Sequence, residues 1–281
     1  MKYEIYFKEY LRLIETTLIK LLPPAKQYPS LIHEAMRYSV FPGGKRFRPV
    51  LCHAACETVG GGEAEALLPA ASLELIHCYS LVHDDLTAMD DDDERRGKPT
   101  CHRQFGEPVG LLAGDALLTL AFQALSQVKP PARVGRLLAE ISTSAGSYGM
   151  IGGQTAELME GQGSLTLPKL DFISSHKTGK LIKACAVSGA IAADASGPAV
   201  KRMNQYGEAV GLAFQFIDDL ADGDGYLRQM NVEEARGRVR ELIAHAKRAI
   251  HPFGKKAAKL HALADFLLER MPQDTHAAVD R

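Results

Sequence analysis

The stretch from Leu73 to Glu94, LELIHCYSLVHDDLTAMDDDDE, is the most informative part of the chain for predicting its fold. Its first half places apolar residues at the spacing of a helix that is largely buried. Its second half is acidic, since seven of the eleven residues from Asp84 to Glu94 carry a carboxylate. Like charges at the end of a core helix cost stability unless a cation neutralises them. The stretch therefore predicts a core helix that ends in a cation-binding turn.

The rest of the chain is dominated by the same helical periodicity. Strand signals are almost absent, because no β-branched runs with period-two alternation flank Asn-Gly or Asp-Gly turns. The pattern predicts an all-α helical bundle, and the even spacing of Pro and Gly predicts one domain over residues 1–281. Main predicted helices cover Ala64–Leu86, 109–127, Ala132–Glu157, Lys169–Ala193, Ala199–Leu220, 232–250 and 257–270.

Composition narrows the class of protein. With 33 basic and 34 acidic residues the net charge is −1, so no global positive field exists to hold a nucleic acid. Five scattered cysteines favour neither a disulfide framework nor a zinc site, and we expect a reducing cytoplasm. The most apolar stretch, Val109–Leu125, contains Asp115 and Gln123, which favours a buried core helix over a membrane span.

A basic, glycine-rich loop reads GGKRFRP from Gly43 to Pro49. Two glycines allow a tight turn, and three cations follow within four positions. Such a loop before a helix suits a phosphate or diphosphate, because lysine offers a point charge and arginine a two-pronged donor. A solvated basic turn is the alternative interpretation.

The acidic run itself suggests Mg²⁺, a cation that prefers a few carboxylates together with substrate phosphates. Residues six apart on a helix point roughly 240° from each other at ~100° per residue, so Asp84 and Asp90 would not share a helical face. Both can reach one metal group only if the helix ends or bulges between Leu86 and Met89.

A second acidic patch, FQFIDDLAD, runs from Phe214 to Asp222. Asp218 and Asp222 are four apart and share a helical face at the end of another apolar helix. One such motif is a common accident of sequence. Two carboxylate patches, each at the end of an apolar helix, are not easily accidental.

Taken together, GGKRFRP, HDDLTAMDDDDERRGKPTCH, HKTG at His176–Gly179 and FQFIDDLAD resemble the trans-isoprenyl diphosphate synthases in order and spacing. The resemblance runs from about Leu31 to Asp222 and resumes more loosely from Tyr226 to Leu268. It implies a helical bundle around a central cavity, with the two aspartate motifs facing each other, in a homodimer.

The resemblance also implies an activity, head-to-tail prenyl transfer. Three Mg²⁺ would bind between Asp84 and Asp90, with Asp85 assisting, and Asp218 and Asp222. Released diphosphate would act as the base. The substrates would be isopentenyl diphosphate, held by Lys45, Arg48, His77 and Arg96, and an allylic diphosphate, held by Arg95, Lys177 and Gln215, with Thr178 also in the substrate site.

Some of these residues also have a purely structural interpretation. His77 could simply be packed in its helix, and Lys177 could be a solvated helix residue. Glu157, where the family usually has Asp, is interpreted as peripheral. Bulky Tyr79 and small Ser80 would form the floor of the pocket for the growing chain, which favours farnesyl diphosphate as product, with geranylgeranyl diphosphate second. Tyr79 as ordinary core packing is the alternative.

One feature departs from the family pattern. Only Gly223-Asp224-Gly225 separates Asp222 from Tyr226, where family members have a much longer loop with a Gly-Lys pair and another basic residue. Either the segment is deleted, or the printed sequence lacks it. A non-catalytic subunit that binds diphosphates is therefore a second hypothesis beside the enzyme.

Overall fold

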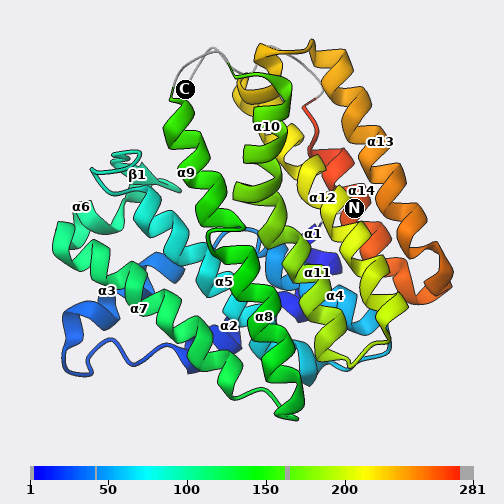
Figure 1. Ribbon diagram of the computed structural model, residues 1–281. Coiled ribbons are helices and arrows are strands. Elements are labelled where there is room, and N and C mark those ends of the chain that lie inside the picture. Colours follow the sequence, from blue (N-terminus) through cyan, green and yellow to red (C-terminus); the bar gives the residue numbers. More distant parts are fainter. Residues whose placement is uncertain (1–2, 42, 162–164, 273–281) are drawn as a thin grey trace. The chain divides into compact units, whose positions relative to one another are not determined.

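The computed structural model describes residues 3–41, 43–161 and 165–272, most of which are helical (Figure 1). Within these ranges the strands are the two-residue β1 (Glu94–Arg95) and β2 (Lys98–Pro99), which form an antiparallel hairpin. The all-α prediction is confirmed. The hairpin was missed by the sequence analysis, because two residues are too few to show period-two alternation.

The chain divides into two compact units. The N-terminal unit comprises Lys2–Val50 and Leu67–Val134, and the C-terminal unit comprises Leu51–Ala66 and Gly135 onward. The boundaries fall within α4 (Phe47–Thr58), α5 (Glu63–Asp84) and α8 (Ala132–Ala145). The prediction of one domain over the whole chain stays a prediction.

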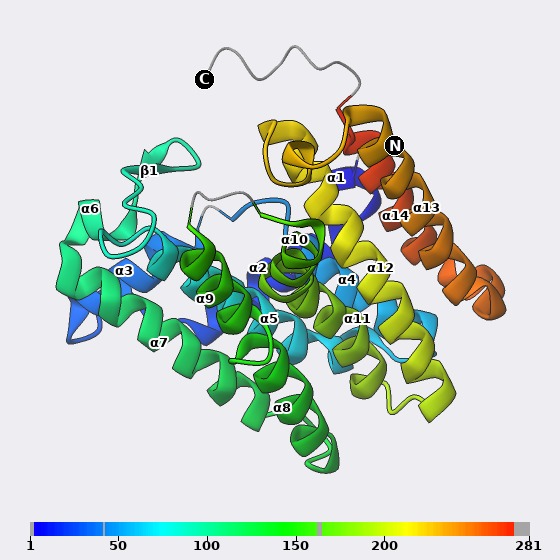
Figure 2. The ribbon, with the colours of Figure 1, turned by 45° about the horizontal axis from the view of Figure 1, so that its top comes forward.

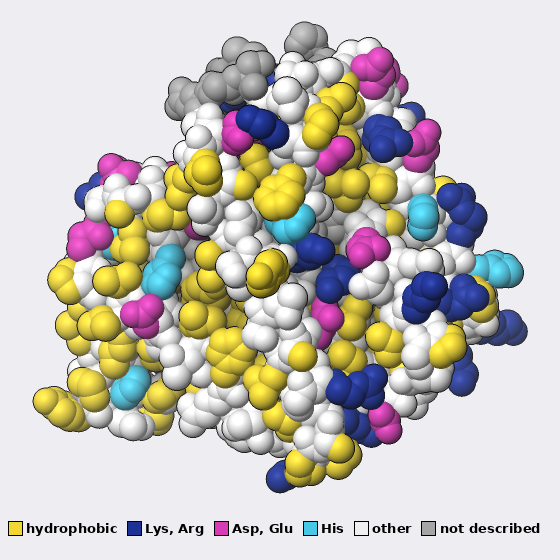
Figure 3. Space-filling model, viewed as in Figure 1, with side chains coloured by type: hydrophobic (Ala, Val, Ile, Leu, Met, Phe, Trp, Pro, Cys, Tyr) yellow, Lys and Arg dark blue, Asp and Glu magenta, His cyan; other side chains and the backbone are white. Residues whose placement is uncertain are grey.

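In the N-terminal unit, α3, α6 and α7 pack against one another. One face of α7 is buried through small and apolar residues such as Gly110, Ala113 and Leu117, as predicted for a core helix. On its other face Leu111 and Leu112 are exposed, and hydrophobic side chains gather over this helix in the space-filling view (Figure 3). The helices that lie wholly in this unit are α1 (Tyr3–Tyr6), α2 (Lys8–Leu21), α3 (Ser30–Val40), α6 (Cys101–Phe105) and α7 (Glu107–Ser126).

Length and composition alone would let α7 cross a membrane, and it is the one helix of the described ranges for which this holds. Its packing against α3 and α6 accounts for the same apolar character.

In the C-terminal unit, α12 lies between α11 and α13 (Figures 1 and 2). The elements of this unit, in chain order after α8, are α9 (Met150–Glu160), α10 (Leu167–Ile173), the π-helix η1 (Ser174–Gly179), α11 (Lys180–Ala192), α12 (Gly197–Asp222), the 3₁₀ turn η2 (Gly225–Arg228), α13 (Val232–Ile250), the 3₁₀ segment η3 (His251–Ala257) and α14 (Ala258–Arg270).

The single helix predicted over Ala132–Glu157 is wrong, since α8 ends at Ala145 and α9 begins at Met150. Gly149, the residue that precedes α9, has the non-helical angles φ −140° and ψ −127°. A Cβ at this position would lie 2.0 Å from the carbonyl oxygen of Ser144. The break therefore depends on a close backbone approach that only glycine permits, and apolar periodicity does not reveal it.

The helix predicted over Lys169–Ala193 is continuous but not uniform. Its first part is α10 and its last part is α11, and between them the six residues of η1 wind as a π-helix. A π turn widens the helix by one residue and is often found at functional sites. Here it carries the motif His176–Gly179.

Candidate active site

The end of α5 brings Asp84 and Asp90 together. The helix ends at Asp84, and the amide of Asp90 donates to the carbonyl of Asp84 at 2.9 Å. Between them the amide of Met89 donates to the carbonyl of Leu86 at 2.8 Å, which closes a tight turn. The predicted interruption of the helix is confirmed, and it starts before the stretch Leu86–Met89. As a result, two carboxylate residues that a regular helix would point apart are neighbours.

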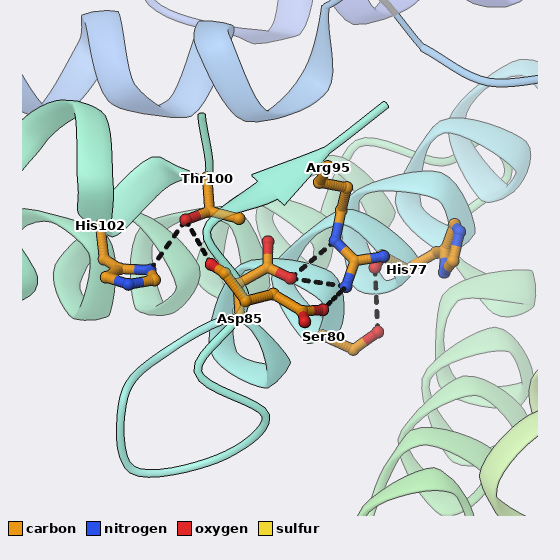
Figure 4. A network of polar contacts seen from close by, with 7 residues as sticks. His77, Ser80, Asp85, Arg95, Thr100 and His102 are labelled. Carbon is orange, nitrogen blue, oxygen red and sulfur yellow. Dashed lines mark hydrogen bonds and ion pairs between the residues drawn. The ribbon is translucent and has the colours of Figure 1, made fainter. Parts of the chain in front are cut away.

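The second aspartate of this motif has an internal partner. Asp85 is buried, and Arg95 donates to its Oδ1 from Nε at 2.6 Å and from Nη2 at 2.5 Å (Figure 4). Burial raises the pKa of Asp85, while the hydrogen bond from Arg95 opposes that effect. Arg95 also reaches Asp92 at 3.2 Å. Asp85 therefore fixes the Arg95 guanidinium in place, and its assisting role at a metal stays a prediction.

The hairpin β1–β2 carries the arginine pair. Arg95 pairs with Lys98, and Arg96 and Gly97 form the turn with φ 56° and 72°. The hydroxyl of Tyr38 donates to the carbonyl of Pro99 at 2.7 Å and attaches the hairpin to α3. A Cβ added to Gly44 would lie 3.0 Å from Nη2 of Arg96. The basic loop and Arg96, both predicted to hold isopentenyl diphosphate, are thus in contact.

One of the three cations of the basic loop points inward. Arg46 is buried, with φ 50°, and donates to Glu15 at 2.7 Å, to Glu74 at 2.7 Å and to the carbonyl of Val40 at 2.8 Å. Lys45 is exposed and Arg48 is partly exposed. The sequence analysis assigned Lys45 and Arg48 to isopentenyl diphosphate and gave Arg46 no role. The sequence signal for an inward-pointing cation was Glu74, a single carboxylate within an apolar helix.

His77 lies among the same cations. Burial of its ring and the charges of Arg48 and Arg96 lower its pKa well below the ordinary value, although some of its surface is exposed. A neutral imidazole can donate one hydrogen bond to a diphosphate without adding charge. The structure thus places Lys45, Arg48, His77 and Arg96 in one unit and brings His77 near both arginines.

Tyr79 and Ser80 occupy the last turns of α5. The ring of Tyr79 is buried and meets His83 edge-on, with the ring centroids 5.8 Å apart. Its hydroxyl has no hydrogen-bond partner within the described residues. The Ser80 hydroxyl donates to the carbonyl of His77 at 2.9 Å, as Figure 4 shows. The buried, unpaired hydroxyl means that Tyr79 is held by packing alone.

In the C-terminal unit, the second aspartate motif ends α12. Asp218 and Asp222 are one turn apart on this helix, and Oδ1 of Asp218 lies 3.6 Å from Nη2 of Arg270. Asp219, between them, is buried and accepts hydrogen bonds from Gln215 Nε2 at 2.7 Å and from the amide of Tyr226 at 2.9 Å. Burial raises the pKa of Asp219. Asp219 therefore has its partners within the fold, Asp218 lies near Arg270, and Asp222 is exposed.

The π-helix η1 carries Lys177 and Thr178, and α9 packs beside it. Nζ of Lys177 forms an ion pair with Glu157 of α9. That Glu157 is peripheral to the chemistry stays an interpretation, but the structure brings it into contact with Lys177, 20 residues away in the sequence. Sequence spacing contains no sign of this pairing.

A cavity of about 330 Å³ opens at the end of α12. It brings together Lys177, Gln215 and Asp222 from the predicted site, whereas Thr178 and Asp218 are not among its lining residues. The charged lining residues that the sequence analysis did not assign to the site are Glu157, Asp219, Asp224 and Arg228.

The short connection after Asp222 forms a packed turn. Gly223 and Gly225 both adopt positive φ, 71° and 58°, and a Cβ at Gly225 would lie 2.1 Å from Oδ2 of Asp219. Tyr226 is buried and stacks on Phe216 with the centroids 3.9 Å apart. Its hydroxyl donates to Asp171 at 2.6 Å. In this chain, α12 therefore leads directly into η2.

The two aspartate motifs belong to different units, so their predicted opposition across a cavity stays a prediction. Within the described residues, no group of three or more His, Cys, Asp or Glu side chains could hold a metal ion.

Comparisons with known proteins agree on one family. Its model, described as Polyprenyl synthetase, matches residues 29–232. The chain is 41% identical over 266 residues to a dimethylallyltranstransferase of Fischerella ambigua, covering 86% of this chain and 77% of the relative. It is 42% identical over 267 residues to geranylgeranyl pyrophosphate synthase 7, chloroplastic, of Arabidopsis thaliana, with the same coverage.

Solved structures show the same fold. An FPP/GFPP synthase from Zymomonas mobilis superposes with a TM-score of 0.90 at 33% identity, covering 94% of this chain and 98% of that chain. A geranyltransferase from Legionella pneumophila gives a TM-score of 0.88 at 34% identity, with 95% and 97% covered.

Proposed function

Because the chain belongs to the polyprenyl synthetase family and is a prenyltransferase acting on isoprenyl diphosphates, we propose that it makes geranylgeranyl diphosphate. It would add isopentenyl diphosphate, head to tail, to allylic diphosphates. The observation that most supports prenyl transfer is the span of the family match, residues 29–232, which contains every predicted metal and diphosphate residue from Lys45 to Asp222.

Mg²⁺ fits the residues that are present. Asp84 and Asp90 meet at the end of α5, Asp218 and Asp222 lie one turn apart on α12, and all four offer hard oxygen donors. These residues would hold the ions. Bound Mg²⁺ would supply positive charge against the diphosphate that leaves the allylic carbon.

The side chains of the chain supply the remaining electrostatics. Arg95, held by Asp85, and Lys177, held by Glu157, are pre-positioned cations for the allylic diphosphate. Fixed cations stabilise the negative charge that develops as the C–O bond breaks, because they need no reorganisation. Lys45, Arg48, His77 and Arg96 would bind isopentenyl diphosphate, whose double bond then attacks the allylic cation.

The twenty-carbon product is favoured by the relatives, several of which are named geranylgeranyl diphosphate synthases. Farnesyl diphosphate is the second candidate, and Tyr79 favours it. This ring is buried five residues before Asp84, where it would limit the length of the growing chain.

The test is the purified chain with Mg²⁺, radiolabelled isopentenyl diphosphate and either geranyl or farnesyl diphosphate. A geranylgeranyl synthase extends both acceptors to twenty carbons, whereas a farnesyl synthase extends geranyl diphosphate once and leaves farnesyl diphosphate unchanged. Magnesium-dependent binding of diphosphate without any product would instead support the non-catalytic subunit.

We also propose that the chain is a cytoplasmic homodimer. The five free cysteines, all buried, are consistent with a reducing compartment. Exposed Leu112 on α7 and Leu31 on α3 flank an apolar cavity of about 710 Å³ in the N-terminal unit, a surface that a second copy could cover. Sedimentation at micromolar concentration, compared with a Leu112→Glu variant, tests this association.

A further inference from the structure

Arg228 follows the short connection between Asp222 and Tyr226, where the family pattern has a longer loop with basic residues. It therefore lies at the cavity at the end of α12, which lacks the cations of that loop. It is exposed, on the 3₁₀ turn η2, and lines the same cavity as Lys177 and Gln215. None of the family motifs in the sequence includes it.

The position of Arg228 is fixed by the packed turn that precedes it. Tyr226, two residues earlier, is anchored three ways, by stacking on Phe216, by its amide on Asp219 and by its hydroxyl on Asp171. Only Leu227 lies between this anchor and Arg228, so the backbone of Arg228 is held at the cavity.

Carboxylates outnumber cations among the charged residues that line the cavity. Its charged lining residues are four carboxylates, Glu157, Asp219, Asp222 and Asp224, against two cations, Lys177 and Arg228. A diphosphate entering such a cavity depends strongly on every cation present.

Each of the two cations is paired with one of these carboxylates. Lys177 contacts Glu157, and Arg228 contacts Asp224 through two donors, Nε to Oδ1 and Nη2 to Oδ2, the second at 2.7 Å. A guanidinium that engages a carboxylate with two parallel bonds has the geometry that also engages two oxygens of a phosphate.

We propose that Arg228 is a substrate-binding residue of this chain, which releases Asp224 and binds the diphosphate of the allylic substrate beside Lys177. In this exchange the carboxylate of Asp224 is a competitor of the diphosphate. The inference rests on the proposed function, since it specifies one more contact in that site.

The central variant is Arg228→Gln, which keeps a hydrogen-bonding side chain and removes the charge. We expect KM for geranyl diphosphate to rise about tenfold or more, since a charge-assisted, two-pronged contact is lost, while KM for isopentenyl diphosphate stays within about twofold. Arg228→Lys should recover part of the loss. The matched control is Arg238→Gln, because Arg238 is also exposed and paired with a carboxylate, Glu241, on α13 outside the cavity.

Asp224→Asn tests the competition directly. Asparagine can still accept the hydrogen bond from the amide of Gly225, but it no longer carries a charge. Titration with inorganic diphosphate and Mg²⁺ in a calorimeter should show binding to Asp224→Asn several times tighter than to wild type, and binding to Arg228→Gln about tenfold weaker.

The outcomes separate the inference from the proposed function. If wild type neither binds magnesium diphosphate nor forms product, the proposed function fails. If wild type does both and Arg228→Gln has the same allylic KM and diphosphate affinity, only the role of Arg228 is overturned. Equal loss in Arg228→Gln and Arg238→Gln would also overturn it.

Discussion

Arg46 and Glu74 form a buried ion pair, with Nη1 of the arginine 2.7 Å from Oε1 of the glutamate and their side chains 1% and 3% exposed. The pair joins the basic loop to the middle of α5. Removing one partner of such a pair leaves an uncompensated buried charge, whereas replacing both partners with apolar residues can be nearly neutral.

We therefore expect the single and the double variant of this pair to differ in stability. Arg46→Met should lower the free energy of unfolding by about 3–5 kcal/mol, and the double variant Arg46→Met, Glu74→Leu should recover most of that loss. Urea unfolding followed by circular dichroism measures both. A double variant that is as unstable as the single one would mean that Arg46 acts through Glu15 or Val40 instead.

The turn that joins Asp90 to Asp84 predicts that both carboxylates are needed for activity. Asp84→Asn and Asp90→Asn should each reduce kcat by about 100-fold or more and raise the Mg²⁺ concentration for half-maximal rate. Asp93→Asn is the control from the same acidic run, because Asp93 is mostly exposed and pairs with Arg103. Wild-type rates in Asp90→Asn would refute a metal role for this residue.

Tyr79 predicts the length of the product. Tyr79→Ala removes a buried ring and should shift the product toward longer chains, seen by chromatography of the dephosphorylated prenyl alcohols. Tyr79→Phe should leave chain length unchanged and stability equal or higher, because the hydroxyl that it deletes is buried without a hydrogen-bond partner in the described part of the chain. Unchanged products in Tyr79→Ala would assign the ring to core packing only.

Because His53 is buried and its pKa is lowered, we expect the folded protein to lose stability in acid. Burial and the charge of Lys259 lower its pKa from 6.5 to about 4, so below pH 6.5 the unfolded state binds a proton that the folded state does not. Stability contributed by neutral His53 is therefore present above pH 6.5 and lost as the pH falls toward 4.

Between pH 7 and pH 5 this loss is on the order of 2 kcal/mol. Unfolding of wild type and His53→Gln at both values measures it, since the glutamine cannot be protonated. The exposed His251, changed to Gln, is the control. The prediction fails if the pH dependence of His53→Gln equals that of wild type.

Gly225 and Gly237 should respond in opposite ways to alanine. Gly225→Ala forces a Cβ to within 2.1 Å of Asp219 at φ 58° and should destabilise the chain by about 1 kcal/mol or more. Gly237 lies within α13 with nothing near its Cβ position, so Gly237→Ala should stabilise by about 0.5–1 kcal/mol. Thermal melts of the two variants compare them directly.

The sequence by itself determined the helical class, most helix positions, the two aspartate motifs and the family. These properties follow from local periodicity and from motif order, which the linear chain contains in full. It also indicated that α5 must end before Asp90, because the angular spacing of a regular helix separates Asp84 from Asp90.

Only the tertiary structure decided which charged side chains serve the fold and which remain for a ligand. Arg46 and Asp219 turned out to have internal partners, Asp85 holds Arg95, and Glu157 holds Lys177. Two of these four pairs, Arg46–Glu74 and Glu157–Lys177, are 20 or more residues apart in the sequence. Whether a charge is buried and paired depends on packing between distant segments, and neither residue type nor spacing within one segment contains that information.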